Sequence, residues 1–198
     1  MLAEFVGIML GDGYFVRDRL KITLNSIVDK KYLDYVSNVI FLLFYEKPII
    51  KYRKKENAVD VFLFKRKVLN YMSKLGLVYS PKWKRAKIPS KFLKFGTNVL
   101  RGYFDTDGCV VVTNNNGTIY PRLEMKICPS PMQKQFIEIL SKCDFKFGVY
   151  DIGDGKVRIQ MNGKKQLRKW LDIVGFGNEK HLIKALKFVK NKNSGERI

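Results

Sequence analysis

Two stretches of the chain share an apolar pattern that ends in Asp-Gly, residues 5–13 and residues 100–108. Within each stretch two small residues stand four positions apart. These small residues are Gly7 and Gly11 in the first stretch and Gly102 and Thr106 in the second. Four residues turn a helix through about 400°, so each pair lies on one helical face, and small residues there let two helix backbones approach closely. We expect the two helices to pack together, with Asp12 and Asp107 close to each other at their C-terminal ends.

A polar–apolar alternation follows each stretch. In residues 17–25 the odd positions are polar and positions 20, 22 and 24 are apolar, and residues 122–127 repeat the pattern. A period of two is typical of a half-buried strand. Helical and strand patterns then recur in the same order in both halves. The expected helices are residues 30–44, 65–75, 132–143 and 164–174, and the further strands are residues 48–54, 59–64, 146–152 and 156–161.

The chain is therefore expected to contain two similar halves, residues 1–95 and residues 96–198, joined in one compact unit. Each half reads helix–strand–strand–helix–strand–strand–helix, which predicts an α+β fold. Ser26 and Ser130 are expected to cap the second helix of their halves. The polar tail at residues 191–198 is expected to fray.

The composition indicates a folded protein with a polyanionic partner. Lys and Arg number 38 against 18 Asp and Glu, the net charge is +20, and 46% of residues are hydrophobic, enough for a core. So large a positive excess repels itself, so solubility alone is a weaker explanation than binding to nucleic acid or an anionic surface.

Other features disfavour several classes of protein. The three cysteines show no Cys-X-X-Cys spacing and His181 is the only histidine, which disfavours zinc and favours reduced thiols. No basic segment precedes the first apolar run, and residues 36–44 are too few to span a bilayer. We expect no membrane contact and a location in the cytoplasm or, depending on the host, in an organelle or the nucleus.

The two aspartates stand where a negative charge is unfavourable. A carboxylate in the last helical turn opposes the helix dipole, and two neighbouring carboxylates repel each other. A bound cation would remove both penalties, and the carbonyl oxygens of Gly11 and Thr106 would help to bind it. Few, hard oxygen ligands favour Mg²⁺. A single Gly-Asp-Gly is a turn in most proteins, but two copies in matched contexts favour a functional site.

On these residues, the chain resembles the LAGLIDADG homing endonuclease family in its single-chain form with two motifs, residues 5–13 and 100–108. The order of the flanking elements extends the resemblance over nearly the whole chain. The first motif has Leu10 where the family often has an Asp, and the second retains Asp105 there. In the family the later acidic position binds metal. The resemblance therefore implies that Asp12 and Asp107 are the metal ligands and that Asp105 serves the helix structure.

The resemblance also implies a lysine beside each scissile phosphate. Lys82 and Lys180 stand in equivalent places near the ends of the two halves, and Lys84 is an alternative to Lys82. Asn25 resembles the family's water-positioning residue. The implied catalytic set is Asp12, Asp107, Lys82, Lys180 and Asn25.

The implied reaction is hydrolysis of both strands of a long, specific double-stranded DNA target. Mg²⁺ is the expected cofactor, and Mn²⁺ or Ca²⁺ would fit the same site. Two curved, antiparallel four-stranded sheets are expected to form a saddle over the DNA, with the motif helices at its centre. Arg suits guanine, Asn and Gln suit adenine and Glu suits cytosine, while other lysines grip phosphate. The expected DNA contacts are Arg17, Arg19, Lys21, Thr23, Asn25, Lys51, Arg53, Arg122, Glu124, Lys126, Arg158 and Gln160.

Two other functions share this scaffold and charge. One is an RNA maturase, a splicing cofactor whose partner is intron RNA, and the other is a non-catalytic DNA-binding regulator. Retention of both aspartates and both lysines disfavours the regulator, whereas a maturase could retain both aspartates as well. We expect a monomer, and the sequence leaves open whether its gene lies in an intron, in an intein or alone.

Overall fold

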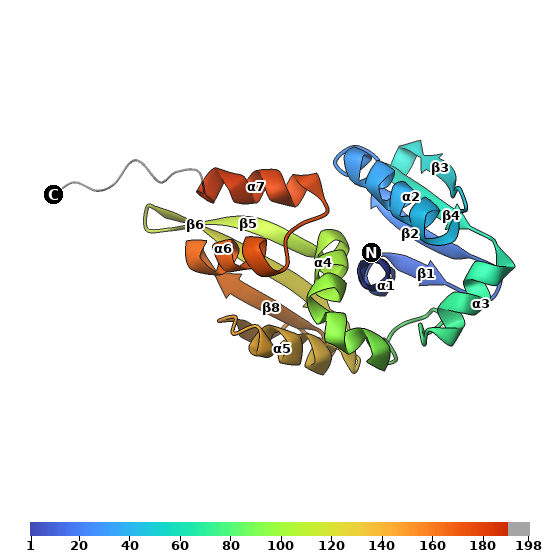
Figure 1. Cartoon of the computed structure of the whole chain (residues 1–198). Helices are drawn as coiled ribbons and strands as arrows, with labels where there is room; N and C mark the ends of the chain where they lie inside the picture. The colour runs from blue at the N-terminus through green and yellow to red at the C-terminus, as the bar shows by residue number, and fades with distance from the viewer. Residues whose placement is uncertain (190–198) are drawn as a thin grey trace.

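The computed structural model describes residues 1–189, which form two four-stranded antiparallel sheets flanking a central pair of helices (Figure 1). The first half contains α1 (Leu2–Leu10), β1 (Gly13–Phe15), β2 (Leu20–Asn25), α2 (Lys30–Phe44), β3 (Ile49–Arg53), β4 (Ala58–Leu63) and α3 (Arg66–Lys74). The second half contains α4 (Gly96–Asp107), β5 (Gly108–Asn115), β6 (Thr118–Ile127), α5 (Met132–Lys142), β7 (Gly148–Asp151), β8 (Val157–Asn162), α6 (Gly163–Ile173) and α7 (Glu179–Val189). Short 3₁₀ turns occupy Lys54–Glu56 and Ser90–Phe95.

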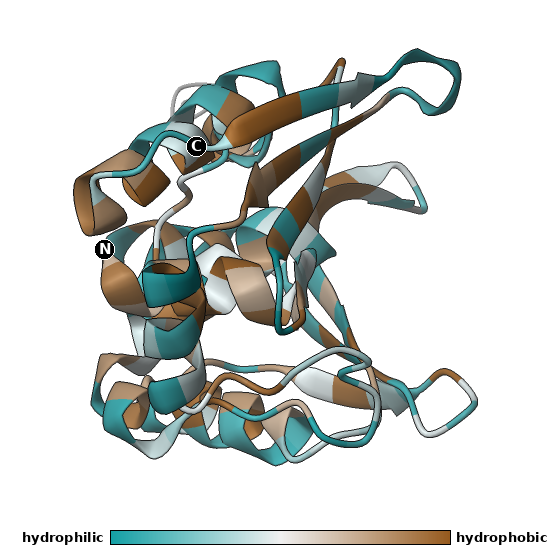
Figure 2. Ribbon diagram, turned by 90° about the vertical axis from the view of Figure 1, so that its right-hand side faces the viewer, coloured by the Kyte–Doolittle hydropathy of each residue, from teal (hydrophilic) through white to brown (hydrophobic). Residues whose placement is uncertain are grey.

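The two sheets have the same topology, which confirms the predicted α+β class and its two pseudo-symmetric halves. The strand orders are β1-β2-β4-β3 and β5-β6-β8-β7. In β2 the alternating residues Leu20, Ile22 and Leu24 are buried. Figure 2 shows the matching alternation of hydrophobic and polar colours along the strands, with helices on one side of the molecule and strands on the other. Each sheet therefore has one face in the core and one face open to solvent.

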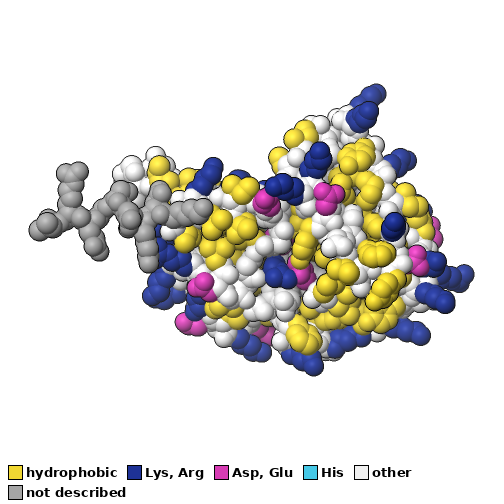
Figure 3. Space-filling model, turned by 45° about the horizontal axis from the view of Figure 1, so that its top comes forward, with side chains coloured by type: hydrophobic (Ala, Val, Ile, Leu, Met, Phe, Trp, Pro, Cys, Tyr) yellow, Lys and Arg dark blue, Asp and Glu magenta, His cyan; other side chains and the backbone are white. Residues whose placement is uncertain are grey.

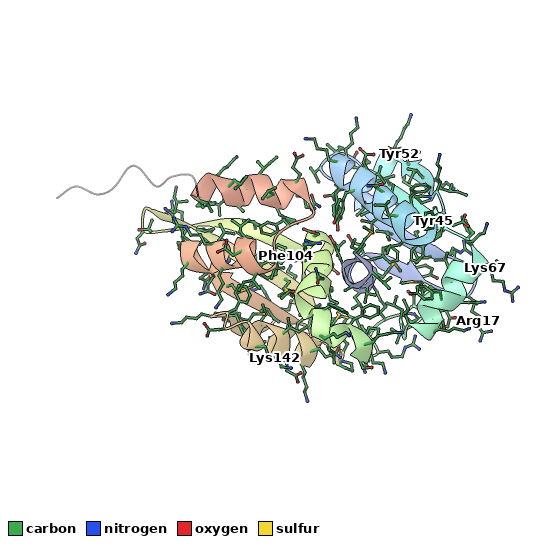
Figure 4. The ribbon with its side chains drawn as sticks, in the orientation of Figure 1. Arg17, Tyr45, Tyr52, Lys67, Phe104 and Lys142 are labelled. Atoms are coloured by element: carbon green, nitrogen blue, oxygen red, sulfur yellow. The ribbon has the colours of Figure 1, made fainter. Side chains whose placement is uncertain are left out.

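The predicted strand at residues 17–25 is too long at its start. β2 begins at Leu20, and Arg17 and Arg19 lie in the turn that joins it to β1. The amide of Val16 donates to the carbonyl of Arg19 at 3.0 Å, which closes this turn. Antiparallel neighbours need such a connection, and the polar alternation concealed it. Arg17 is exposed at the outer edge of the first half (Figure 4).

Neither predicted serine cap forms. The residue before α2 is Asp29, and the turn ahead of it is organised by Asn25, whose Oδ1 accepts from the amides of Ile27 and Val28 at 2.9 and 3.1 Å. Ser130 donates its hydroxyl to the carbonyl of Cys128 instead of accepting from the helix.

α7, which follows α6 and adds a helix to the second half, was not predicted from the sequence. α7 contacts β5 and β6, and its buried residues are His181 and Ala185. In the core beneath it, the ring of Phe104 on α4 lies 4.7 Å from that of Trp170 on α6 and 5.4 Å from His181 (Figure 4). The tail predicted to fray, residues 191–198, lies outside the described residues. Within residues 1–189 no helix combines the length and apolarity needed to cross a membrane.

Candidate active site and nucleic-acid interface

The two central helices, α1 and α4, touch at their glycines, and their C-terminal ends lie on the same side of this contact. A Cβ atom added to Gly7 would lie 2.1 Å from the carbonyl oxygen of Val99, and one added to Gly102 would lie 2.1 Å from that of Glu4. Only glycine therefore fits at either position. The packing predicted from the small residues is observed, and it brings the two C-terminal ends together.

At that shared end, the two motif aspartates are neighbours. A Cβ added to Gly11 would lie 3.1 Å from Oδ2 of Asp107, so this carboxyl lies against the end of α1. Loss of hydration and, after it, the charge of Asp12 together raise the pKa of Asp107 to about 7, while Lys82 opposes the shift. The pKa of Asp12 is also raised, first by burial. Asp12 is half-buried and Asp107 keeps an exposed edge, so both can reach a ligand that arrives from solvent.

Lys82 closes the end of α1. Its Nζ donates to the carbonyls of Met9 at 3.0 Å and Leu10 at 2.8 Å, and also to that of Gly11. Burial lowers the pKa of Lys82, and the charges of Asp107 and Asp12 act in the opposite direction. A positive charge at a helix C-terminus is stabilising. Lys82 thus offsets the charge repulsion that the two aspartates create.

Two hollows open beside this ammonium group. One, of about 490 Å³, is lined by Gly11, Asp12, Ser80 and Lys82 among others. The second, of about 220 Å³, is lined by Asp107, Lys82, Lys126 and Lys156 among others. Each hollow is therefore lined by one of the two aspartates, and Lys82 lines both hollows.

Lys180 does not mirror Lys82. Its Nζ lies 2.7 Å from Oδ1 of Asp29, a buried carboxylate that also accepts from Nδ2 of Asn178 at 2.9 Å. Lys180 and Asp29 both affect the pKa of Asp12, in opposite directions, so this cluster lies near the first aspartate. The lysines predicted as equivalent thus have different surroundings: one contacts helix carbonyls and the other a carboxylate.

The donors at the helix ends suit a hard divalent cation. Asp12 and Asp107 offer carboxylate oxygens whose mutual repulsion a cation would relieve. The Gly11 carbonyl already accepts from Lys82, but a carbonyl oxygen has two lone pairs. Among the described residues no group of three or more His, Cys, Asp or Glu side chains could hold a metal ion. The remaining ligands would have to be water or phosphate oxygens, as is usual for Mg²⁺.

All predicted DNA contacts that lie in strands occupy the solvent-facing side of the two sheets. In the first sheet Thr23 is opposite Asp60, and in the second Glu124 is opposite Gln160. Several of these side chains are already paired. Asp60 accepts from Thr23 at 2.7 Å and lies 3.0 Å from Nε of Arg53, and the buried Glu124 pairs with Arg122. Figure 3 shows the helix side of the molecule, where Lys and Arg side chains lie around the outline and also near the middle.

Residues 95–175 match the LAGLIDADG-like domain family. Solved structures resemble the whole chain. The homing endonuclease I-WcaI bound to its DNA recognition sequence aligns with a TM-score of 0.66 at 15% identity, over 92% of this chain and 84% of that one. The chain has the LAGLIDADG fold. The LAGLIDADG meganuclease I-AabMI bound to uncleaved DNA gives 0.66 at 12% identity, over 94% and 88%.

The fold is shared by I-DmoI, solved in complex with DNA and Mn, with a TM-score of 0.56 and 12% identity over 87% of this chain and 94% of that one. Curated relatives include Replication factor C small subunits from Methanocaldococcus jannaschii and Thermococcus kodakarensis, each 26% identical over 97% of this chain. The chain spans only 10% and 21% of the length of those proteins.

α1 and α4 also carry buried acidic residues, and one of them, Glu4, was not predicted from the sequence. Glu4 on α1 is 1% exposed, accepts from the Tyr35 hydroxyl at 2.6 Å and pairs with Arg101 of α4. Asp105 is 1% exposed and accepts from the Gly177 amide at 2.7 Å. The structural role implied for Asp105 therefore consists of anchoring the loop before α7. The sequence signal for Glu4 was its place within an otherwise apolar helix. A buried charge requires a partner, so such a glutamate indicates an ion pair or hydrogen bond in the core.

Proposed function

We propose that this chain is a site-specific double-stranded DNA endonuclease that hydrolyses phosphodiester bonds with a divalent metal. The observation that carries the proposal is the group at the paired helix ends. Two aspartates with raised pKa values flank one lysine ammonium, and two hollows open beside it. Two neighbouring carboxylates at helix C-terminal ends destabilise the fold. Arrangements that are locally unfavourable in this way are expected at functional sites.

The chain's own residues would bind and orient the DNA. Asp12 and Asp107 would hold Mg²⁺ or Mn²⁺, which lowers the pKa of bound water and neutralises charge on the scissile phosphate. Lys82 would act as a fixed positive charge near both phosphates, because three carbonyls accept its hydrogen bonds and an ammonium has no lone pair to take up a proton. Lys180 would act near Asp12 through its ion pair with Asp29. The two DNA strands would therefore meet different electrostatic surroundings.

Asn25 is proposed to position water only through its amide nitrogen. Its Oδ1 is committed to the turn before α2. The register of the second sheet makes Cys128 its counterpart, because Ile22 and Met125 both lie opposite a motif glycine. A different polar group would therefore have to position the attacking water at the second DNA strand.

The test is cleavage of a large plasmid library with the purified chain and Mg²⁺, followed by mapping of the new ends. Recurrent double-strand ends at one sequence support the proposal. Sequence-specific binding without any new ends would indicate a regulator, and stimulation of intron splicing without DNA cleavage would indicate a maturase. Gel filtration of the DNA complex tests the proposed monomer.

A further inference from the structure

Four side chains form a row across the open face of the first sheet. The register places Tyr14 opposite Lys21, Lys21 opposite Phe62, and Phe62 opposite Ile49, so the row crosses β1, β2, β4 and β3 in turn. Ile49 is 59% exposed and Tyr14 is 43% exposed. Three of the four side chains are thus large and apolar on the face that would meet the polyanion.

Phe64, just beyond the end of β4, extends this row. Its ring is stacked on that of Phe62, with centroids 5.6 Å apart and an interplanar angle of 14°, and it is 48% exposed. A hollow of about 310 Å³ is lined by Ile49, Phe62 and Phe64. Its lining also includes Lys47, Arg66 and the ion pair of Lys65 with Glu46. We call Tyr14, Ile49, Phe62 and Phe64 the apolar row.

The second sheet has a polar row at the equivalent place. There Cys109 is opposite Glu124, Glu124 is opposite Gln160, and Gln160 is opposite Gly148. Phe62 thus corresponds to Gln160, and Ile49 to a residue without a side chain. The chain repeats its backbone but not the chemistry of its open faces. The apolar row is therefore not required by the fold.

We propose that the apolar row contacts thymine C5-methyl groups in the major groove of the half-site beneath the first sheet, an inference that rests on the proposed endonuclease function. The thymine methyl is the apolar group on the major-groove edges of the four bases, and apolar side chains recognise it by contact. Lys21 lies between Tyr14 and Phe62, with its Nζ 5.7 Å from the centroid of the Tyr14 ring. Its ammonium group would bind a backbone phosphate and so position the apolar row in the groove. The proposed target therefore has a thymine-containing block in one half only.

Removal of the methyl groups one at a time tests this inference. A duplex enriched by the full-length chain from a random library in Ca²⁺ is remade with deoxyuridine in place of each thymidine. Each contacted methyl should be worth about fourfold in affinity, the effect of burying one methyl group. The affected positions should fall in one half of the site.

Variants then identify the side chains responsible. Phe62→Ala and Phe64→Ala should each bind the unmodified duplex more weakly and lose discrimination between thymidine and deoxyuridine at one or two positions. Gln160→Ala, the matched variant in the polar row, should keep that discrimination. Since Phe64 is half exposed, its truncation leaves the core intact, and thermal denaturation verifies the fold of each variant.

The inference is overturned if deoxyuridine weakens the parent and the two Phe variants equally, or if the enriched site has no thymine block. Stronger binding of single-stranded RNA or DNA without methyl dependence would overturn it too, because the rings would then stack on unpaired bases. Cleavage of the enriched duplex in Mg²⁺ with no methyl effect refutes this inference alone. Failure to enrich or cut any duplex refutes both this inference and the proposed function.

Discussion

The Nζ of Lys82 lies 2.8 Å from the carbonyl oxygen of Leu10, so a lysine from outside the helix closes the C-terminal end of α1. The same ammonium group borders both of the hollows that contain the motif aspartates. One residue thus supports the helix end and supplies charge to the site, and these two roles can be separated experimentally.

Replacing Lys82 by Met should affect both stability and activity. The variant loses hydrogen bonds from a charged donor and leaves the last carbonyls of α1 unpaired, which should cost about 1–3 kcal/mol of unfolding free energy. DNA cleavage should be abolished. Urea denaturation and plasmid cleavage measure the two effects. Lys84→Met is the control, because Lys84 is exposed, and equal losses in both variants would contradict the role given to Lys82.

Gly7→Ala and Gly102→Ala should each destabilise the whole protein. The new Cβ atom would lie 2.1 Å from a backbone oxygen of the other helix, so α1 and α4 must separate. Overpacking of a core typically costs about 1–3 kcal/mol, and the separation would also shift the aspartates. Denaturation midpoints and cleavage rates should fall together. A variant as stable as the parent would show that the helices do not meet at these residues.

Asp107→Asn should stabilise the protein at pH 8 in the absence of metal. The raised pKa of Asp107 means that its ionised form disfavours the fold, so stability is lost as the pH rises from 3.8 towards about 7. Since Asp107 keeps an exposed edge, water screens part of the effect, and we expect a gain of about 1 kcal/mol. The gain should vanish near pH 4. A loss of stability at pH 8 would mean that the carboxylate is favourably paired.

The buried His181 should make the protein sensitive to acid. Burial lowers its pKa to about 4, assisted by Lys180 and Lys184 and opposed by Asp29. Between pH 6.5 and 4 the unfolded chain binds a proton that the folded chain does not, so stability falls as the pH falls through this range, by about 3 kcal/mol. His181→Phe should reduce that slope, because the ring would join Phe104 and Phe176. Equal slopes in both proteins would contradict this assignment.

The helix pair at the centre of the molecule was predictable because its cause is local. Small residues four apart mark a face where backbones touch, and the repeat of that pattern identifies the two helices as partners. Strand alternation likewise fixed which residues of β2 face the core, although it did not reveal the turn at Arg17 and Arg19, whose polar residues fit the same alternation.

The partners of the charged residues could not be read in the same way. Lys82 and Lys180 occupy similar places in the sequence, yet Lys82 contacts α1 and Lys180 contacts Asp29. Such pairings join residues that are distant in the chain, and a single sequence contains no signal for them. α7 was overlooked for a related reason: a glycine after α6 appeared to end the second half, and the helix beyond it buries only a narrow face.

The most direct test measures binding and strand-resolved cleavage of the enriched duplex by Asp12→Asn, Asp107→Asn and the double variant. If the two aspartates hold metal at the DNA, all three variants should bind with nearly parental affinity in the absence of divalent metal, and none should produce double-strand breaks in Mg²⁺. Unimpaired double-strand cleavage by the double variant would contradict the account.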